Sequence, residues 1–392
     1  TNEINLVKGI KQCSIMMGTD ANKDILKNTG LLTEEGSSAS PSDMVIVLEI
    51  EDESVVPAVL VKIDQFLSDL SVKKELNKGV EANSLEEALE LQPDANIALF
   101  SIPGEYAADV IEQALDKNLN IFSFTDNVSL DDEVRLKKIA HDKGLLLMGP
   151  DCGTGILSGI PFAFANVVRT GNIGIVGASG TGIQEVSTLI DRMGGGVVHA
   201  IGTGGRDLSD AVQAITVKDA LIALENYSPA EVLVLISKPP AKTVRDEIVN
   251  LLQNLSKPVV AIFLGELPDC HLNNVYLAHT LEETARIAVD LANGVPVKNN
   301  YLEDLGNSVP EKLPESATVK GLYSGGTLGS EAAMLITESL GLGKLIHKEG
   351  YLLDEQGYQV IDFGDDKYTQ GRPHPMIDPQ SRIEAIKKFG AD

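Results

Sequence analysis

Apolar and polar residues alternate along this chain in a succession of strand-like and helix-like segments. Short runs that are mostly apolar, as in buried strands, occur in the first part of the chain at 13–17, 44–50, 95–102, 120–124 and 145–148. Segments with helical spacing of apolar residues lie between or after them, at 20–28, 55–70, 85–91, 105–117 and 130–143. Residues 31–43 are predicted to form a loop. The alternation predicts a mostly parallel sheet with helices on both faces, an α/β fold.

The same alternation continues in a second region and begins again in a third. Predicted strands of the second region lie at 173–176, 197–201, 231–236 and 259–264, and its predicted helices at 184–190, 208–214, 244–255 and 281–291. The third region repeats the order of strand, Gly-rich turn and helix, with a further strand at 360–363. Since 392 residues exceed one ordinary core, we expect domains at 1–165, 166–296 and 318–392, with a polar linker at 297–317.

The segment GNIGIVGASGTGIQEVSTLI carries the clearest chemical signal. Gly177, Gly180 and Gly182 crowd the turn between its predicted strand and helix, where glycine lets the backbone approach a ligand closely. Ser179 or Thr181 is suited to cap the helix, whose free N–H groups and positive dipole end favour an anion. The turn lacks the Lys-Ser or Lys-Thr pair of a Walker loop, and its spacing differs from GxGxxG. It predicts a phosphate or carboxylate cradle; a turn that only packs strand against helix is the alternative.

Other turn-forming and polar residues follow the remaining predicted strands. Because the carboxyl ends of parallel strands share one edge, where ligands bind in such folds, we assign these residues to the site as well. Those assigned to phosphate or substrate are Asp151, Gly153, Gly204, Gly205, Gly325, Gly326 and Thr327, with Arg372 and His374 from a later turn. Those assigned to a cofactor are Gly18, Thr19, Thr125 and Asn127.

Two cations at strand ends are assigned as the catalytic residues. Lys238 follows a predicted strand beside two prolines, a position that suits an ammonium neutralising phosphate, although a surface lysine is the alternative reading. Arg206 closes the Gly-rich turn GTGGRD. His271 and His279 stand alone in the sequence, and lone histidines are usually surface or core residues. Cys152 is assigned a packing role for the same reason.

Composition narrows the class of ligand and partner. The chain has 57 acidic against 32 basic residues, a formal net charge of −25, which repels nucleic acid and anionic membranes at long range. An anionic ligand must therefore be held by local N–H groups and a few fixed cations. The three cysteines lie far apart without a CxxC pattern, so we expect no disulfide framework, no metal site and a reducing cytoplasm. No signal peptide or membrane-spanning apolar run is evident.

Several motifs in one order resemble known families. GPDCGT, GNIGIVGASGTGIQEV, GTGGRD and KPVVAIFLG resemble the alpha subunit of succinyl-CoA synthetase. MMGTDANK, IPGEYAAD, MGPDCGTGI, GGRDLS, SKPPA, YSGGTL and GDDKYTQGRPHPMIDP are similar to the FdrA proteins over nearly the whole chain. The resemblance implies a Rossmann-like CoA-binding-type domain, a flavodoxin-like synthetase-type domain and a partial third ligase-type α/β domain. It also implies that both ends are incomplete, since the family has an earlier strand and a longer third domain.

Two departures from the synthetase pattern change the expected chemistry. Synthetase alpha subunits carry a phosphorylated histidine in a GHAGA-like segment, whereas the corresponding region here reads CHLNNVYLAHTLEETA, with His279 as the nearest candidate. The synthetase turn Gly-Glu-Ile-Gly-Gly, whose acid steadies that histidine, is replaced by Ser237-Lys238-Pro239-Pro240. A cation in place of the acid favours phosphate held directly in the cradle over a phosphohistidine relay.

The FdrA resemblance implies a subunit of a multi-subunit, oligomeric enzyme of allantoin breakdown that transfers a carbamoyl group between oxamate and carbamoyl phosphate. Lys238, Arg206 and the helix N–H groups would then stabilise phosphate and the tetrahedral oxyanion. An ATP-dependent acid–CoA ligase using coenzyme A and an acyl phosphate, or a non-catalytic ligand-binding scaffold, are the alternatives. The acceptor, the direction of reaction, the subunit composition and phosphorylation of His279 stay open.

Overall fold

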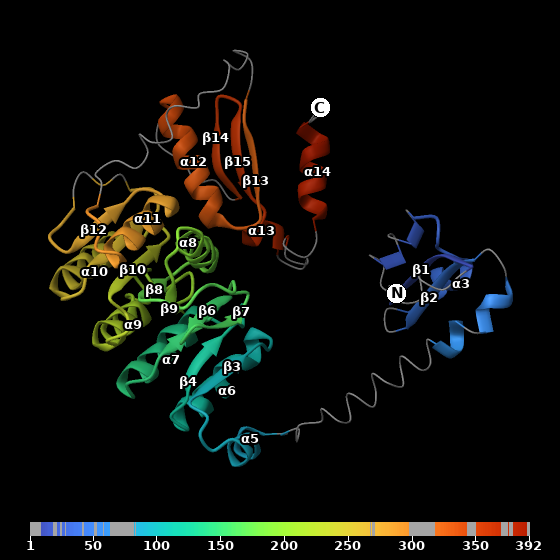
Figure 1. Ribbon diagram of the computed structural model, residues 1–392, viewed down its shortest axis with the longest axis horizontal. Helices are drawn as coiled ribbons and strands as arrows, with labels where there is room; N and C mark the ends of the chain where they lie inside the picture. Colours follow the sequence, from blue (N-terminus) through green and yellow to red (C-terminus); the bar gives the residue numbers. More distant parts are fainter. Residues whose placement is uncertain are drawn as a thin grey trace. The chain divides into compact units, whose positions relative to one another are not determined.

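The computed structural model of this chain describes residues 9–18, 22–23, 26–27, 29–40, 43–50, 53–57, 59–62, 82, 84–266, 268, 271–297, 318–342, 350–369, 375 and 379–389 (Figure 1). The chain divides into two compact units, Thr1–Pro93 and Asp94–Asp392. The division at residue 93 falls inside the first of the expected domains, and the expected boundaries at residues 165 and 296 stay predictions.

The first unit contains a two-stranded antiparallel sheet. β1 (Ile10–Met17) and β2 (Met44–Ile50) pair with Cys13 opposite Leu48. Both predicted strands are confirmed, but the prediction that they join a parallel sheet is wrong, because a buried apolar run does not encode strand direction. The predicted loop between them contains the short helix α3 (Glu34–Ser38), capped by Thr33.

Two further elements of this unit are short helices. They are the 3-10 helix η1 (Glu53–Val55) and the predicted helix α5 (Leu85–Leu91), which begins after Ser84, whose side chain accepts from the N–H of Glu87. The predicted helices at 20–28 and 55–70 lie partly outside the described residues.

The second unit begins with a small parallel sheet whose strands and helices the sequence predicted. The strands are β3 (Ile97–Phe100), β4 (Asn120–Ser123) and β5 (Leu147–Met148), in that order in the sheet. The helices between them are α6 (Gly104–Asp116) and α7 (Leu130–Asp142). α7 begins after Ser129, which caps the N–H of Asp132, and carries three acids in its first turn, as the helix dipole favours.

A seven-stranded sheet forms the centre of this unit, in the order β12-β11-β10-β8-β9-β6-β7. Its strands are β6 (Thr154–Leu157), β7 (Ile160–Ala163), β8 (Ile173–Gly177), β9 (Val197–Gly202), β10 (Val232–Ser237), β11 (Val259–Phe263) and β12 (Val275–Ala278). The five strands from β9 to β12 are parallel, and counted from β8 their order is 2-1-3-4-5, that of flavodoxin-like folds. The hairpin β6–β7 extends this sheet antiparallel to β9.

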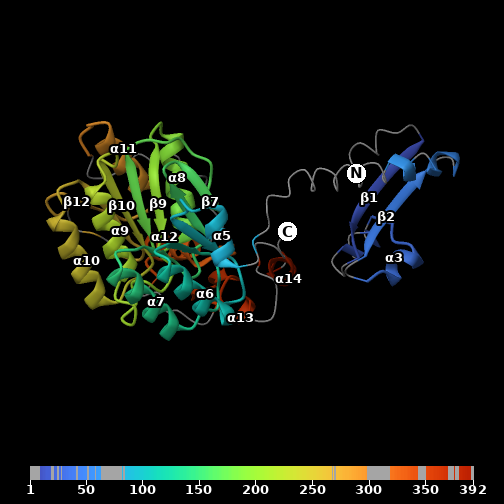
Figure 2. The ribbon, with the colours of Figure 1, turned by 90° about the horizontal axis from the view of Figure 1, so that it is seen from below.

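Four helices cover the two faces of this sheet (Figure 2). They are α8 (Gly180–Arg192), α9 (Ile215–Asn226), α10 (Lys242–Asn254) and α11 (Leu281–Ala292). Alternate strand residues serve opposite faces: Ile175 packs in the core with α8 and α11, and Val176 in the core with α9 and α10. The predicted helix at 208–214 is wrong. Gln213 and Ala214 have φ values of 61° and 55°, so the backbone there is left-handed and α9 begins only afterwards.

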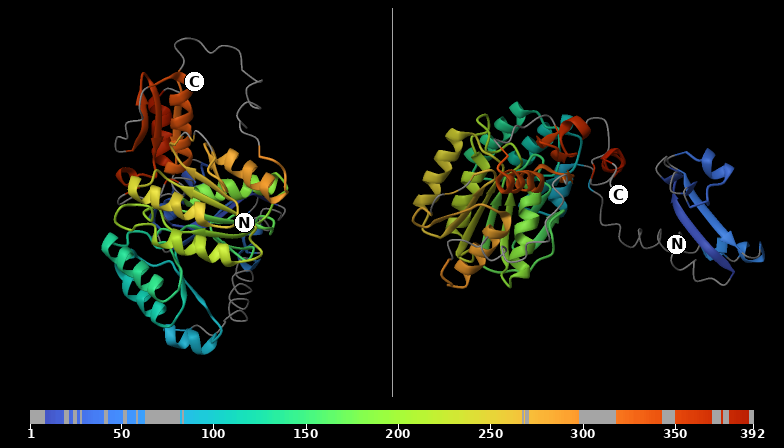
Figure 3. Two further views of the ribbon diagram at one scale, coloured as in Figure 1. Left: turned by 90° about the vertical axis from the view of Figure 1, so that its left-hand side faces the viewer. Right: turned by 90° about the horizontal axis from the view of Figure 1, so that it is seen from above.

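The last part of the unit is a small α/β arrangement, in which α12 lies along a three-stranded sheet (Figure 3). Its elements are β13 (Lys320–Tyr323), α12 (Gly326–Leu340), β14 (Tyr351–Glu355), β15 (Tyr358–Asp362), α13 (Asp366–Thr369) and α14 (Gln380–Phe389). β13 and β15 are parallel, and β14 pairs antiparallel with β15. The predicted strand, Gly-rich turn and helix are confirmed, as is the α/β fold class. Each helix within the described ranges is too short or too polar to cross a bilayer.

Candidate functional site

The centre of the sheet contains a topological switch point. β8 and β10 are neighbours, but α8, which follows β8, packs on one face and α10, which follows β10, on the other. The two chain segments therefore diverge at the carboxyl ends of these strands, where ligands bind in open α/β sheets. Gly177 ends β8 and Ser237 ends β10, so the glycine-rich turn and Lys238 lie side by side.

A cavity of about 630 Å³ lies at this point. Its wall combines the segments that follow β3, β4, β5, β8, β9, β10, β13 and β15. The structure brings together in this wall thirteen of the residues assigned from the sequence: Thr125, Asp151, Gly153, Gly177, Ser179, Gly180, Thr181, Gly204, Gly205, Lys238, Gly325, Gly326 and Thr327. Polar wall residues that were not assigned to the site from the sequence include Gln184 and Asp362.

The starts of two long helices meet at this cavity. Ser179 caps α8 by accepting from the N–H of Gly182 at 3.0 Å, while the N–H groups of Gly180 and Thr181 have no acceptor within the part of the chain that the structure describes. α12 begins after Gly325 without a side-chain cap. The hydroxyl oxygens of Ser179 and Thr327 lie 2.6 Å apart and join the two starts. Two positive dipole ends with free N–H groups thus serve one cavity, an arrangement that favours a multiply charged anion.

Two glycines of the cavity wall are required by close packing. A Cβ on Gly177 would lie 2.6 Å from Cγ1 of Ile183, so the strand end and the first turn of α8 are in close contact. Gly204 has φ of 86°, and a Cβ there would lie 2.4 Å from the carbonyl oxygen of Pro150. These positions place the backbone of both turns at the cavity surface.

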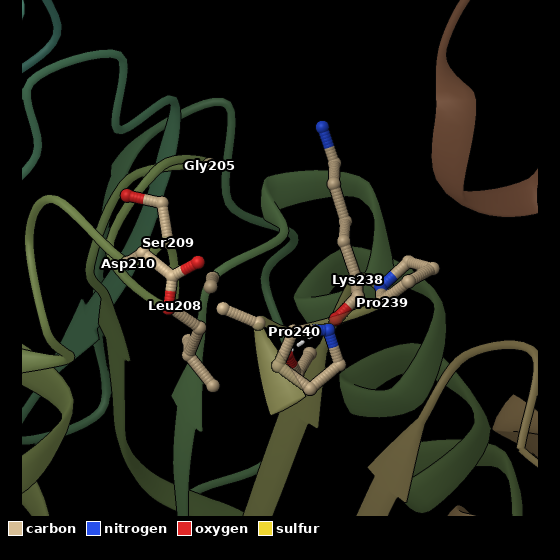
Figure 4. A pocket seen from close by; sticks show the side chains of 10 residues that line it. Gly205, Leu208, Ser209, Asp210, Lys238, Pro239 and Pro240 are labelled. Carbon is tan, nitrogen blue, oxygen red and sulfur yellow. Dashed lines mark hydrogen bonds between the residues drawn. The ribbon is translucent and has the colours of Figure 1, made fainter. Parts of the chain in front are cut away.

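Lys238 is the cation of this site. Its exposed side chain points away from Pro239 and Pro240 (Figure 4), and it has no ion-pair partner among the described residues. It lines both the main cavity and a neighbouring one of about 420 Å³. A Cβ on Gly205 would lie 3.5 Å from its ammonium nitrogen, so the ammonium is next to the turn after β9.

Arg206, the second predicted catalytic cation, is placed elsewhere. Its Nε lies 2.8 Å from Oε2 of Glu133, and its guanidinium donates to the carbonyl oxygen of Val128. It is absent from the walls of both cavities, because the buried Glu133 carboxylate draws the guanidinium toward α7. The direct role assigned to Arg206 therefore has no support in this geometry.

Gly182 and Asn127, two further assigned residues of the second unit, are not part of the cavity wall. Gly182 is the third residue of α8, and its N–H is already bound to the side chain of Ser179. Asn127 is exposed and has φ of 57°, and it is not part of the wall. Gly18 belongs to the first unit, while Thr19, Arg372 and His374 lie outside the described residues.

His279 is engaged away from the cavity. Its side chain is 6% exposed, with Nδ1 3.0 Å from the carbonyl oxygen of Glu266 and Nε2 2.9 Å from Oε2 of Glu338 on α12. Both ring nitrogens therefore have oxygen partners, which leaves neither free to accept a phosphoryl group. His279 also lines neither of the two cavities beside Lys238.

The thiol in the cavity wall is unsuited to nucleophilic chemistry. Cys152 is buried, and its Sγ lies 3.3 Å from the carbonyl oxygen of Gly202. Burial raises the pKa of this thiol to about 12, so it stays protonated at neutral pH. Among the described residues, no group of three or more His, Cys, Asp or Glu side chains is placed to hold a metal ion.

Sequence models of three domains match the chain. That of the AllF heavy metal-associated domain matches residues 1–84, that of the CoA binding domain residues 168–265, and that of the CoA-ligase domain residues 322–392. The CoA binding match falls on the region that the sequence assigned to the flavodoxin-like domain, and the CoA-ligase match falls on the third.

Relatives of known sequence extend over different parts of the chain. The uncharacterized protein YahF of Escherichia coli (strain K12) is 40% identical over 99% of this chain and 77% of its own length. A succinate–CoA ligase [ADP-forming] subunit alpha of Staphylococcus epidermidis is 27% identical over 47% of this chain and 61% of its own length, and subunit alpha 2 of Archaeoglobus fulgidus is 27% identical over 47% and 63%. The chain thus spans less than two thirds of these two ligase subunits.

Solved structures with a similar chain course include ATP citrate lyase from Methanothrix soehngenii in complex with citrate and coenzyme A. It aligns with a TM-score of 0.47 and 14% identity over 72% of this chain and 50% of that one. A dinucleotide-forming acetyl-coenzyme A synthetase 1 of Ca. Korarchaeum cryptofilum aligns with a TM-score of 0.40 and 16% identity over 68% and 61%.

Proposed function

Because the chain belongs to the FdrA-like family of YahF and has an acid–CoA ligase-like scaffold, we propose that it is the phosphate-binding subunit of an acyl transferase. The acyl group that we propose is carbamoyl, exchanged between phosphate and oxamate in allantoin catabolism. One observation carries the proposal: the start of α8, the start of α12 and Lys238 all lie at one cavity. α8 has a side-chain cap from Ser179, and α12 has none.

The chain's own groups account for the electrostatic part of this reaction. Hydrogen phosphate binds to the free N–H groups of Gly180 and Thr181, with the start of α12 opposite, and Lys238 neutralises part of its charge. A phosphate oxygen attacks the carbamoyl carbon of oxalurate, and the same donors stabilise the resulting oxyanion. The bond from this carbon to the oxamate nitrogen breaks, that nitrogen takes the proton of hydrogen phosphate, and carbamoyl phosphate and oxamate are formed.

The CoA-ligase alternative is less well supported by the described residues. A ligase of the synthetase type needs a histidine nitrogen free to carry phosphate, and both nitrogens of His279 are paired. Of the two residues assigned to a cofactor in the second unit, Thr125 lines the cavity and Asn127 does not. No step is therefore assigned to this cofactor. A scaffold without catalysis is the third candidate, and binding measurements separate it from the other two.

The test combines a reaction assay with a binding assay. The chain and its partner subunits are incubated with oxalurate and phosphate, and carbamoyl phosphate is measured by ³¹P NMR. Formation of carbamoyl phosphate supports the proposal, and absence of product from the complete assembly refutes it. Calorimetry of the isolated chain with phosphate and carbamoyl phosphate adds the scaffold test: binding without turnover in the complete assembly identifies a ligand-binding scaffold.

A further inference from the structure

A lysine that no proposed chemistry uses is completely buried beside the site. Lys137 on α7 has a fully buried side chain, and lysines are rarely buried to this extent unless they are paired. Its ammonium lies 2.5 Å from Oδ1 of Asp207 and donates at 2.8 Å to the carbonyl oxygen of Thr203. Oε1 of Glu133, one helical turn earlier, is 3.1 Å away. Two carboxylates and a carbonyl thus surround this one cation.

The partners of Lys137 belong to a turn that builds the cavity. Thr203 and Asp207 lie in the turn after β9, whose Gly202, Gly204 and Gly205 are part of the cavity wall. Lys137 therefore ties this turn to α7, although 66 positions separate it from Thr203 in the sequence. The wall cannot move away from α7 without breaking a buried charge pair.

The same turn is fixed at its other end through Asp207. Oδ2 of Asp207 accepts from the N–H of Val217 at 2.8 Å, and the backbone oxygen of Asp207 accepts from the N–H of Ala214. α9 has no cap from its own N-cap side chain, so Asp207 supplies this cap from the preceding turn. One carboxylate joins the buried ammonium to the start of α9.

The turn in turn positions the cation of the site. A Cβ added to Gly205 would lie 3.5 Å from the ammonium nitrogen of Lys238, so the two residues are neighbours. Both residues line the two cavities. Arg206, between Gly205 and Asp207, is held on Glu133. A displacement of this turn would therefore shift both the N–H surface and the surroundings of Lys238.

From these contacts we propose that Lys137 is a positioning residue: its buried ammonium holds the turn 202–207 in place and thereby shapes the anion cavity around Lys238. Its effect on phosphate rests on the proposed function, but its effect on the turn does not. The two effects are measured separately.

The first measurement reports the position of the turn without any ligand. The thiol of Cys152 is covered by this turn, since a Cβ on Gly202 would lie 2.5 Å from its sulfur. Iodoacetamide labelling at pH 8, mapped to each cysteine by mass spectrometry, is compared between the full chain and Lys137→Met. We expect labelling of Cys152 to be about tenfold faster in the variant, because loss of the ammonium releases the turn. Lys143→Met, which loses an exposed pair with Asp116 near the end of the same helix, is the control and should match the unmodified chain.

The second measurement is the dissociation constant for inorganic phosphate by calorimetry. We expect it to rise about tenfold in Lys137→Met and to stay within about twofold in Lys143→Met, because misplaced donors lose much of their effect. If the unmodified chain binds no phosphate, the proposed function fails, while the labelling result still decides the role of Lys137.

A double variant separates positioning from general stability. Lys137→Met with Asp207→Asn removes opposite charges together, so we expect the Tm to recover relative to Lys137→Met alone. The labelling of Cys152 should stay fast, because the link from α7 to the turn is still missing. This variant also serves if Lys137→Met alone does not fold. Slow labelling of Cys152 in either variant, or joint recovery of Tm and thiol protection in the double variant, would overturn the proposal.

Discussion

The side-chain oxygens of Ser179 and Thr327 lie 2.6 Å apart, although 148 positions separate the two residues in the sequence. Both residues are buried, and each stands at the start of a helix that faces the cavity. This hydrogen bond fixes the distance between the two groups of N–H donors, so an anion held by both helices depends on it.

Replacing Thr327 by valine removes this hydroxyl and nearly preserves the volume. The cap that Ser179 provides to Gly182 remains, so we expect the loss of one hydrogen bond, about 1 kcal/mol, and a phosphate affinity reduced about fivefold. Calorimetry with phosphate measures the change. The matched control is Thr337→Val on the same helix, whose buried hydroxyl has no hydrogen-bond partner among the described residues. Equal losses in both variants would contradict the role of the Ser179 contact.

Replacing Lys238 by methionine removes the ammonium and keeps most of the side-chain stem. A hydrogen bond to a charged group contributes about 1.5–3 kcal/mol, so we expect phosphate to bind roughly 10- to 100-fold more weakly. Because Lys238 is exposed, the Tm should change little. Lys242→Met, an exposed lysine at the start of α10 outside both cavity walls, is the control. Unchanged phosphate affinity in Lys238→Met would remove this residue from the proposed reaction.

Incubation with labelled ATP should leave His279 without label. Its two ring nitrogens face Glu266 and Glu338, so replacement by glutamine should lower the Tm through loss of the buried pair, a cost on the order of 1–3 kcal/mol. His141→Gln, whose ring is exposed beside Asp219, should have a smaller effect. Label that appears on the protein and disappears in His279→Gln would instead favour the acid–CoA ligase.

Glu331 on α12 makes stability depend on pH. Burial raises the pKa of this carboxyl group, whose Oε1 accepts from the N–H of Leu281. A raised pKa means that the folded state favours the protonated acid, so its contribution to stability is complete below the ordinary pKa and is lost as the pH rises through the raised value. Glutamine keeps the acceptor and cannot ionise.

We therefore expect Glu331→Gln to have a higher Tm than the unmodified chain at pH 7 and an equal Tm at pH 4. Scanning calorimetry at both pH values measures this difference. Glu90→Gln, an exposed position on α5, should show no such dependence. A Glu331→Gln variant that is less stable than the unmodified chain at pH 7 would show that the buried carboxylate stabilises the fold, the opposite of this expectation.

Local patterns predicted most of the strands and helices and most of the cavity wall. The Gly-rich turns at Gly177 and Gly325 could be recognised because strand, turn and helix are consecutive in the sequence. Asp362 could have been assigned by the same reasoning, since it lies in the strand predicted at 360–363 and ends the observed strand β15. The short strands β6, β7 and β12 were missed. Gly155 and Pro161 interrupt the apolar runs of β6 and β7, so neither resembles a buried strand in the sequence.

The roles of some residues could not be predicted from the sequence, because they depend on contacts between residues far apart in the chain. Arg206 stands in a glycine-rich turn just as a phosphate ligand would, but Glu133, on a helix far earlier in the sequence, binds it. The role of Lys137 was missed for the same reason, since its partner Asp207 follows it by 70 positions. The helix predicted at 208–214 did not form, and the backbone at Gln213 and Ala214 is left-handed.

The hairpin β6–β7 has a mechanical consequence for the cavity. It follows directly on the turn that holds Asp151 and Gly153, and β6 then pairs with β9 of the central sheet. Two walls of the cavity are therefore parts of one continuous hydrogen-bonded frame, which resists bending between them. The wall carried by α12 is joined to this frame by side-chain contacts instead, such as that of Thr327. We therefore expect α12 to move when a ligand enters or leaves, while the hydrogen-bonded frame stays in place.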